Sequence, residues 1–228
     1  AFVFLSGTSA YLYGAKIGNI KKLSWFLLTR GILLVVLELT VIRFFWTFNF
    51  NYSQFTLAGV IWMLGWCMVF MALLVKLSPK TVGIIGLAII FFQNAFGLVP
   101  SLLPESIRVS FGRFWEFIYS SGLEGPVSIT ILYVIVPWIG VMAAGYGFGT
   151  ILKLESARRK KLLIQIGTGS TLLFLVAGSI MVMIDKQDDS PSFIFKLLNQ
   201  RKYPASQLFL LMTLGPSILL LSFVENVR

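Results

Sequence analysis

The residue best placed to do chemistry is one carboxylate, Glu38, near the middle of the apolar stretch 24–47. As a helix, this stretch is long enough to cross a hydrocarbon core of about 30 Å. A charge at that depth costs on the order of 2.5–3.5 kcal/mol, and the positions one turn away on the same helix are all apolar: Leu34, Val35, Val41 and Ile42. Glu38 therefore needs a partner on another helix, water or a proton. It is a candidate catalytic or proton-transfer group, and a structural contact between helices is the alternative.

Two further polar residues could line a path through the bilayer together with Glu38. Arg43 lies on the same predicted helix, turned about 140° away from Glu38, so direct pairing between them is not expected. Asn94 lies near the end of another predicted span. We expect Glu38 to face the bundle interior, near polar groups at a comparable depth. The candidates are Gln93, Asn94, Tyr133 and Trp138.

A dense basic run occupies residues 153–161, directly after a stretch rich in small residues at 140–149. Cations beside a helix end could hold the phosphates of a cofactor from the cytosol, and the candidate residues are Lys153, Arg158, Arg159, Lys160 and Lys161. Contact with anionic lipid is the alternative. The small residues at 140–149 predict close helix packing, with Trp138 turned inward.

Composition places the chain in a membrane. Of its 228 residues, 57% are hydrophobic and only 12% are charged, with a mean hydropathy of +0.86. Soluble domains carry about 25% charged residues, so a polytopic membrane protein is predicted. The net charge of +10 falls in short loops, which indicates topology and lipid contact and gives no reason to expect nucleic acid. The sequence contains no histidine, which excludes His-based chemistry, and no metal site is expected.

The apolar runs predict an all-α transmembrane bundle forming one domain over residues 1–228. Residues 1–13 look like the second half of a truncated first helix, and about six full spans follow, at 24–47, 56–75, 81–98, 127–151, 162–184 and 205–224. An amphipathic pattern near 106–119 predicts an interfacial helix, with Phe111, Phe114, Trp115 and Ile118 on one face and Arg113 and Glu116 turned away. Lysines and arginines are concentrated in the loops of one side, including 153–161, and the positive-inside rule puts that side in the cytoplasm.

Several segments in this order resemble one family. They are Phe2-Val-Phe-Leu-Ser-Gly-Thr-Ser9, Leu28-Thr-Arg-Gly31, Pro137-Trp-Ile-Gly-Val-Met142 with Gly145, and Lys202-Tyr-Pro204 with Leu214-Gly-Pro216. Over nearly its whole length the chain resembles bacterial members of the membrane acyltransferases related to heparan-α-glucosaminide N-acetyltransferase, many of which are known only as a domain of unknown function. The resemblance implies a protein of the bacterial cytoplasmic membrane that takes acetyl-CoA, or another acyl-CoA, from the cytosol and delivers the acyl group to a sugar or glycan acceptor at the outer face.

The resemblance also implies that the chain is truncated at both ends. The family's proposed catalytic His lies just upstream of the first helix, and this sequence offers no counterpart, so that role is not assigned to any residue here. Two other hypotheses stay open. One is a proton- or cation-coupled transporter or channel with Glu38 as its buried relay, and the other is a structural membrane subunit. A homo-oligomer is also left open.

Overall fold

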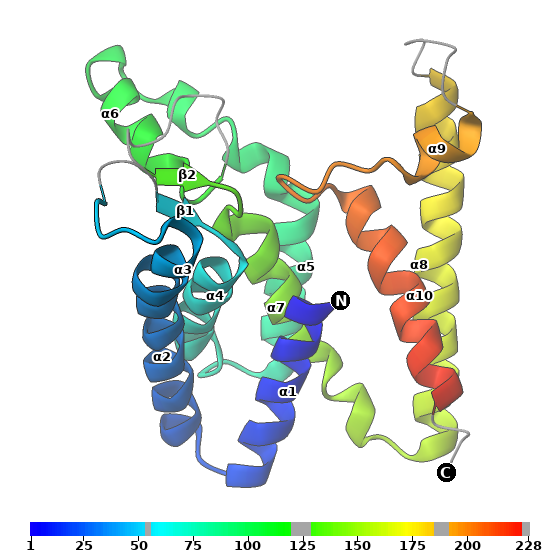
Figure 1. The fold of residues 1–228 in the computed structure, drawn as a ribbon. Coiled ribbons are helices and arrows are strands. Elements are labelled where there is room, and N and C mark those ends of the chain that lie inside the picture. Colours follow the sequence, from blue (N-terminus) through cyan, green and yellow to red (C-terminus); the bar gives the residue numbers. More distant parts are fainter. Residues whose placement is uncertain (53–55, 120–128, 185–191, 225–228) are drawn as a thin grey trace. The chain divides into compact units, whose positions relative to one another are not determined.

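The computed structural model describes residues 1–52, 56–119, 129–184 and 192–224, and these residues are almost entirely helical (Figure 1). They form two compact units, residues 2–150 and residues 151–228 with Ala1. The first unit contains α1 (Phe2–Ile17), α2 (Ile20–Leu37), η1 (Glu38–Ile42), α3 (Arg43–Thr47), β1 (Thr56–Ala58), α4 (Val60–Leu74), α5 (Pro79–Phe96), η2 (Pro100–Leu102), α6 (Glu105–Trp115), β2 (Ile129–Ile131) and α7 (Ile135–Phe148). The second contains η3 (Ile151–Lys153), α8 (Ser156–Ile184), α9 (Phe193–Leu198) and α10 (Gln207–Val224). The predicted all-α fold is confirmed.

Helix α7 is the centre of the first unit and packs against α1, α4 and α5, while α2 packs against α4. Glycines allow these helices to approach closely. A Cβ at Gly145 would fall on the backbone of Phe4, and one at Gly140 would meet the backbone of Gly86. Thr8 on α1 also donates a hydrogen bond from its hydroxyl to the carbonyl oxygen of Gly145, at 3.0 Å. The predicted close packing of this small-residue stretch is therefore confirmed, as is the inward position of Trp138, which is 8% exposed.

A small parallel sheet stands at one end of the first unit. β1 pairs with β2, with Thr56 opposite Ile129 and Ala58 opposite Ile131. The two expected spans that contain these strands are shorter as helices than predicted. The 56–75 span is a strand followed by the 15-residue helix α4. Within the 127–151 span, α7 begins only at Ile135, and residues 127–128 lie outside the described part.

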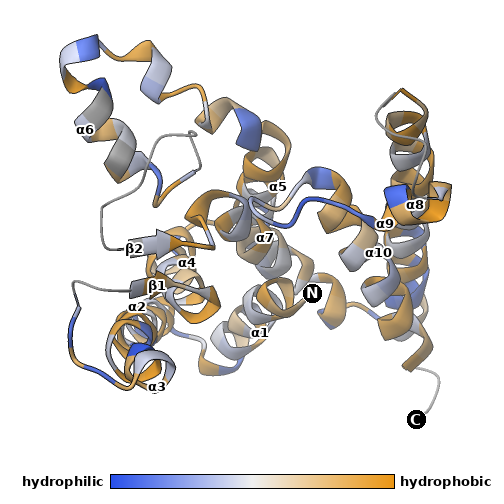
Figure 2. Cartoon of the chain, turned by 45° about the horizontal axis from the view of Figure 1, so that its top comes forward, coloured by the Kyte–Doolittle hydropathy of each residue, from blue (hydrophilic) through white to orange (hydrophobic). Residues whose placement is uncertain are grey.

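Five helical stretches among the described residues are long and apolar enough to cross a membrane. They are Ile20–Thr47, Pro79–Phe96, Ile135–Lys153, Ser156–Ile184 and Gln207–Val224. The prediction of six full spans is one too many, because α4 is too short once β1 has taken the start of its apolar run. Figure 2 shows the helices as predominantly hydrophobic along their length, which is typical of surfaces that face lipid.

In the second unit, α8 and α10 pack along each other. A Cβ at Gly215 would meet the backbone of Thr171, and one at Gly167 would meet Leu219, so small residues again set the helix spacing. The sequence places a charged loop before a span at 162–184, but α8 already begins at Ser156 and includes most of the basic run. Arg and Lys are good helix formers, so the helix extends beyond the apolar segment that revealed it.

The predicted interfacial helix is present as α6, although its position on a membrane stays a prediction. Phe111 and Trp115 stack with ring centroids 5.3 Å apart, and the Trp115 indole N–H donates to the carbonyl oxygen of Phe96 at 2.7 Å. The expectation that Glu116 turns away is wrong, because it is only 8% exposed. Glu116 is the C-cap residue of α6 and its backbone is still helical, with its N–H donating to the carbonyl oxygen of Gly112, so its burial shows that this side of the helix end is covered by other residues. The side chain of Arg113 lies outside the described part.

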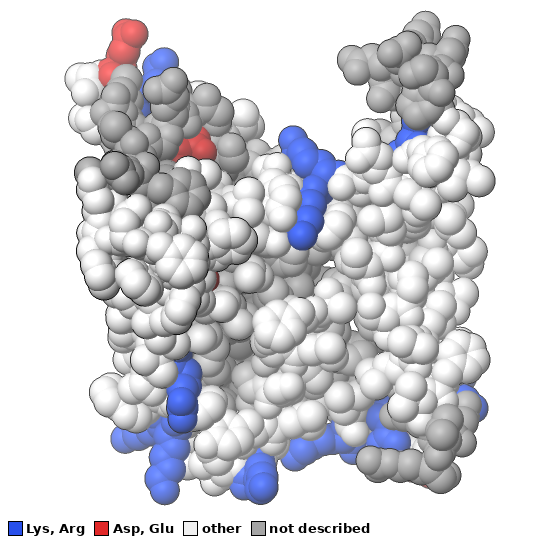
Figure 3. Space-filling view, in the orientation of Figure 1, with Lys and Arg blue, Asp and Glu red and all other residues white. Residues whose placement is uncertain are grey.

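Basic residues gather at the end of the first unit opposite its sheet. Lys16 lies in the last turn of α1, Lys21 and Lys22 in the first turn of α2, and Lys80 in the first turn of α5, while Lys76 follows α4. Figure 3 shows this concentration of Lys and Arg at the lower end of that unit, whereas β1, β2 and α6 lie at its upper end in Figure 1. The first unit therefore has a basic end and an end that carries the sheet, as a protein oriented by the positive-inside rule would have.

Candidate functional site

Glu38 is held in the interior of the first unit and is 5% exposed. It lies where α2 widens into the π-helical turn η1, before the chain continues as α3. Such turns are rare and are frequently found at functional sites. The expectation that Glu38 faces the interior is confirmed.

The Glu38 carboxylate lies against the beginning of α4. The backbone N–H groups of Gly59, Ile61 and Trp62 make hydrogen-bonding interactions with it. Gly59 is the N-cap residue of α4 and has no side chain that could accept hydrogen bonds from the first N–H groups of the helix. The Glu38 carboxylate, from another helix, accepts these hydrogen bonds instead. The helix dipole also favours a negative charge at this end. A Cβ at residue 59 would overlap Glu38 Oε1, which explains the glycine.

The second carboxylate oxygen of Glu38 remains available for chemistry. Oε2 is buried and has no hydrogen-bond partner among the described residues. Leaving a buried acceptor unpaired costs on the order of 1–3 kcal/mol, and more for a charged group, so such atoms call for a functional explanation. One oxygen is thus held by the start of α4, while the other can accept a proton or a hydrogen bond.

The sheet and the segment after α6 cover this region. The carbonyl oxygen of Ala58 accepts hydrogen bonds from the N–H groups of Leu132, at 3.2 Å, and Tyr133, at 3.3 Å. The Trp62 ring packs on Phe117, with centroids 5.8 Å apart. Ala58 and Trp62 are close to the backbone groups that bind Glu38. They therefore connect the Glu38 site to the segment before α7 and to the segment after α6.

Arg43, predicted to line a path with Glu38, organises a loop. It is 3% exposed, and its guanidinium donates to the carbonyl oxygen of Asn49 at 2.8 Å and to that of Asn51. It also lies over the Tyr52 ring, 4.1 Å from the centroid. These contacts close the turn that follows α3, so the contacts described for Arg43 support a structural role.

Asn94 and Gln93 have different environments although they are neighbours on α5. The Asn94 side-chain oxygen accepts a hydrogen bond from the Tyr119 hydroxyl at 3.1 Å, and the Asn94 residue is exposed. Gln93 is 1% exposed, and neither atom of its amide has a partner among the described residues. The sequence named Asn94 as the functional candidate, but the unusual environment belongs to Gln93.

The basic run lies on η3 and the first two turns of α8. Arg159 donates from its guanidinium to the carbonyl oxygens of Leu152 and Leu154, at 3.3 and 3.2 Å, and so closes the connection into α8. Lys153, Arg158 and Lys161 are exposed. The cluster combines cations with a helix N-terminus, and both favour an anionic group.

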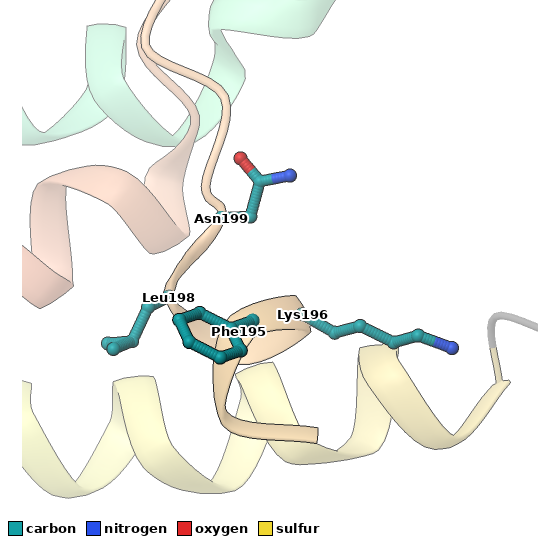
Figure 4. Close-up of a pocket in the computed structure, with 4 residues that line it drawn as sticks. All are labelled: Phe195, Lys196, Leu198 and Asn199. Carbon is teal, nitrogen blue, oxygen red and sulfur yellow. The ribbon is translucent and has the colours of Figure 1, made fainter. Parts of the chain in front are cut away.

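A separate pocket of about 400 Å³ lies beside α9 (Figure 4) and is lined by Phe195, Lys196, Leu198 and Asn199. In this view Lys196 and Asn199 extend to one side and Leu198 to the other. The pocket contains none of the site residues expected from the sequence. Within the described ranges, no group of three or more His, Cys, Asp or Glu residues could hold a metal ion.

The sequence did not predict that Glu38 binds backbone N–H groups at the start of α4. The available signal was Gly59 directly before an apolar run, because glycine is an acceptable N-cap that brings no side chain to serve the first N–H groups. Comparison of the chain with models of protein families, with curated proteins and with solved structures gives no match.

Proposed function

We propose that the protein is an integral membrane acyltransferase that moves an acyl group from cytosolic acyl-CoA to a sugar or glycan acceptor at the outer face, with Glu38 as the general base. The observation that carries this proposal is the buried Glu38 carboxylate, with one oxygen held by α4 and the other unpartnered. The ordered series of motifs that resembles membrane acyltransferases gives the reaction class.

The location of Glu38 agrees with delivery towards the outer face. It contacts the start of α4, whereas Lys76 follows the other end of that helix, about 22 Å away at about 1.5 Å per residue. With the basic end in the cytoplasm, Glu38 lies on the outer side of the bilayer centre. The proposed location is the bacterial cytoplasmic membrane.

The proposed reaction is a proton transfer coupled to acyl transfer. Glu38 Oε2 accepts the proton of an acceptor hydroxyl or amine, whose oxygen or nitrogen then forms a bond to the thioester carbonyl carbon. The carbon–sulfur bond breaks, the CoA thiolate leaves, and Glu38 passes its proton through water to the thiolate, which restores the carboxylate. The N–H groups of Gly59, Ile61 and Trp62 hold the base in place.

The phosphates of acyl-CoA are assigned to Lys153, Arg158, Arg159, Lys160 and Lys161. Five cations within nine residues, at the beginning of a helix, match a ligand with several negative charges. An anionic lipid headgroup would use the same chemistry. Competition between CoA and phosphatidylglycerol vesicles for the purified protein distinguishes these two ligands.

The second candidate is a proton- or cation-coupled transporter, favoured by the same buried carboxylate acting as a relay. The two functions differ in what they consume. An acyltransferase uses one thioester for each acceptor modified, while a transporter moves its substrate with acyl-CoA unchanged.

Glu38→Gln in the full-length protein, reconstituted in nanodiscs, tests the proposal. The amide keeps an oxygen for the N–H groups of α4 but cannot act as a base, so we expect turnover of acetyl-CoA with glucosamine to fall by about 10²–10⁴-fold while the protein still folds. Glu105→Gln, at an exposed position on α6, is the matched control. Undiminished acyl transfer in Glu38→Gln would refute the role of Glu38, and flux without thioester consumption would favour the transporter.

A further inference from the structure

Besides Glu38, Gln93 is a polar side chain of the first unit that is buried without a partner among the described residues. It is 1% exposed, and both its amide nitrogen and its amide oxygen lack hydrogen-bond partners among the described residues. A buried amide normally satisfies at least one of these groups. Because Gln93 leaves both a donor and an acceptor unused, it is suited to a ligand that can accept and donate at the same place.

The packing of α5 on α7 places Gln93 beside the beginning of α7. A Cβ at Gly83 would meet Gly147, one at Gly86 would meet Gly140 and Ala144, and one at Gly140 would meet Ile89. Residue numbers rise along α5 as they fall along α7, so the helices are antiparallel. Gln93, one turn beyond Ile89, is level with the first turn of α7, at residues 135–138.

Gln93 also shares a helix face with residues of a hydrophobic cluster. Ile89 and Phe96, four residues before it and three after, pack against a buried cluster formed by Tyr119, Val134 and Val136. Positions with this spacing lie on the same side of a helix. The Gln93 amide therefore points towards the apolar segment that leads into α7.

Glu38 is linked to the same segment through the end of β1. It contacts Gly59, and the neighbouring Ala58 accepts hydrogen bonds from Leu132 and Tyr133, directly before α7. Among the described residues, two buried polar groups with unused hydrogen-bonding atoms are thus connected to residues 132–138, Gln93 through the packing of α5 on α7 and Glu38 through Gly59 and Ala58. A common ligand accounts for both.

We infer that Gln93 is an acceptor-positioning residue that binds a hydroxyl of the sugar whose reacting group faces Glu38. This inference rests on the proposed function and specifies how the acceptor is held. A hydroxyl both donates and accepts, so it can pair with the amide oxygen and with the amide nitrogen. Neighbouring hydroxyls on one sugar ring let a single ligand satisfy Gln93 and Glu38 together.

Gln93→Leu tests this role, because leucine fills a similar volume without hydrogen-bonding atoms. Gln165→Leu makes the same change at an exposed position of α8 and is the matched control. With the full-length protein in nanodiscs, we expect Gln93→Leu to raise the KM for glucosamine about tenfold or more, since an unmade hydrogen bond in a polar site costs at least that factor. The KM for acetyl-CoA and the slow hydrolysis of acetyl-CoA in the absence of glucosamine should stay within about twofold of wild type.

A purely structural amide predicts a different result. Leucine would then match the apolar surroundings better, so thermal stability would rise and the KM for glucosamine would not change. An unchanged KM for glucosamine in Gln93→Leu would overturn the inference while leaving acyl transfer by Glu38 intact.

Thermal stabilisation by glucosamine provides a readout that needs no turnover. A rise in the Tm of the wild type that Gln93→Leu loses and Gln165→Leu keeps supports the inference, even if no acyl group is transferred, and in that case the proposed function alone fails. An equal rise in wild type and Gln93→Leu, or no rise in the wild type, refutes the role of Gln93. The acyl-transfer assay then decides the proposed function separately.

Discussion

The two units of this protein use polar residues in different ways. Among the described residues, the buried polar side chains of the first unit are Thr8, Glu38, Arg43, Thr56, Gln93 and Glu116. The second unit has Ser222, whose hydroxyl donates a hydrogen bond to the carbonyl oxygen of Leu219 at 2.7 Å. The span Ile135–Lys153, which contains α7, is 72% buried, whereas Ile20–Thr47 and Pro79–Phe96 of the first unit are each 17% buried, like Ser156–Ile184 of the second. The first unit encloses polar groups, and the second presents apolar helices and cations.

This difference indicates where chemistry can occur. A membrane protein places ionisable groups in its interior only where they are paired or functional, because their burial is expensive. Within the part of the chain that the structure describes, Glu38 Oε2 and both amide atoms of Gln93 lack partners, and both residues belong to the first unit. The cations at the start of α8 are mostly at the surface, where they can bind an anion without a preformed cavity.

The largest expected effect compares a glycine on the buried helix α7 of the first unit with a glycine on the exposed helix α8 of the second. Gly145→Leu would place a side chain on the backbone of Phe4, so we expect a loss of stability of about 4 kcal/mol or more, or failure to fold. Gly169→Leu on α8 is the control, because no atom of the described residues lies within 4 Å of the position of its Cβ. Thermal unfolding of the purified proteins measures both, and equal stability of the two variants would contradict the contrast.

The second prediction compares the loss of stability when one arginine of each unit is removed, and the expected effect is smaller. Arg43→Ala removes the hydrogen bonds to Asn49 and Asn51 and leaves their carbonyl oxygens without this donor, so we expect a loss of about 2–4 kcal/mol. Arg158→Ala, at an exposed position on α8, should change stability by less than about 0.5 kcal/mol. Unfolding in detergent mixtures measures the difference. If Arg43→Ala is as stable as wild type, the loop does not depend on its guanidinium.

The substitution with the smallest expected effect on the fold tests the orientation of the protein in the membrane. Arg158→Cys should leave the fold intact and, in intact cells, should resist a membrane-impermeant thiol reagent, because the positive-inside rule puts this basic cluster in the cytoplasm. Labelling should appear once the cells are permeabilised. The native Cys67 is buried and serves as an unreactive background. Ready labelling in intact cells would contradict the predicted orientation of this basic cluster.

Hydropathy was sufficient to predict the helical class, since long apolar runs must satisfy their backbone hydrogen bonds internally when they cross lipid. It was also sufficient to place Glu38 in the interior, because its own helix has no partner one turn away. The small residues at 140–149 correctly indicated close packing. These features depend on side-chain properties that can be read from the sequence of a single helix.

Features that depend on backbone geometry between distant segments were not predictable. The partner of Glu38 is the N-terminus of α4, and N–H groups are present at nearly every position, so no residue type marks them. The pairing of β1 with β2 shortens two expected spans for the same reason. Asn94 and Gln93 look equivalent in the sequence, but consecutive positions on a helix are turned about 100° apart, which separates an exposed amide from a buried one.

The parallel pairing of β1 and β2 has a consequence for biogenesis. Glu38 precedes α4 in the chain, so its charge becomes stable in the bilayer only when α2 and α4 come together as a hairpin. The strand that covers this region from the other side, β2, follows only after α4, α5 and α6. A chain inserted only as far as α5 therefore has the backbone partners of Glu38 but lacks β2, so the site is completed only late in folding.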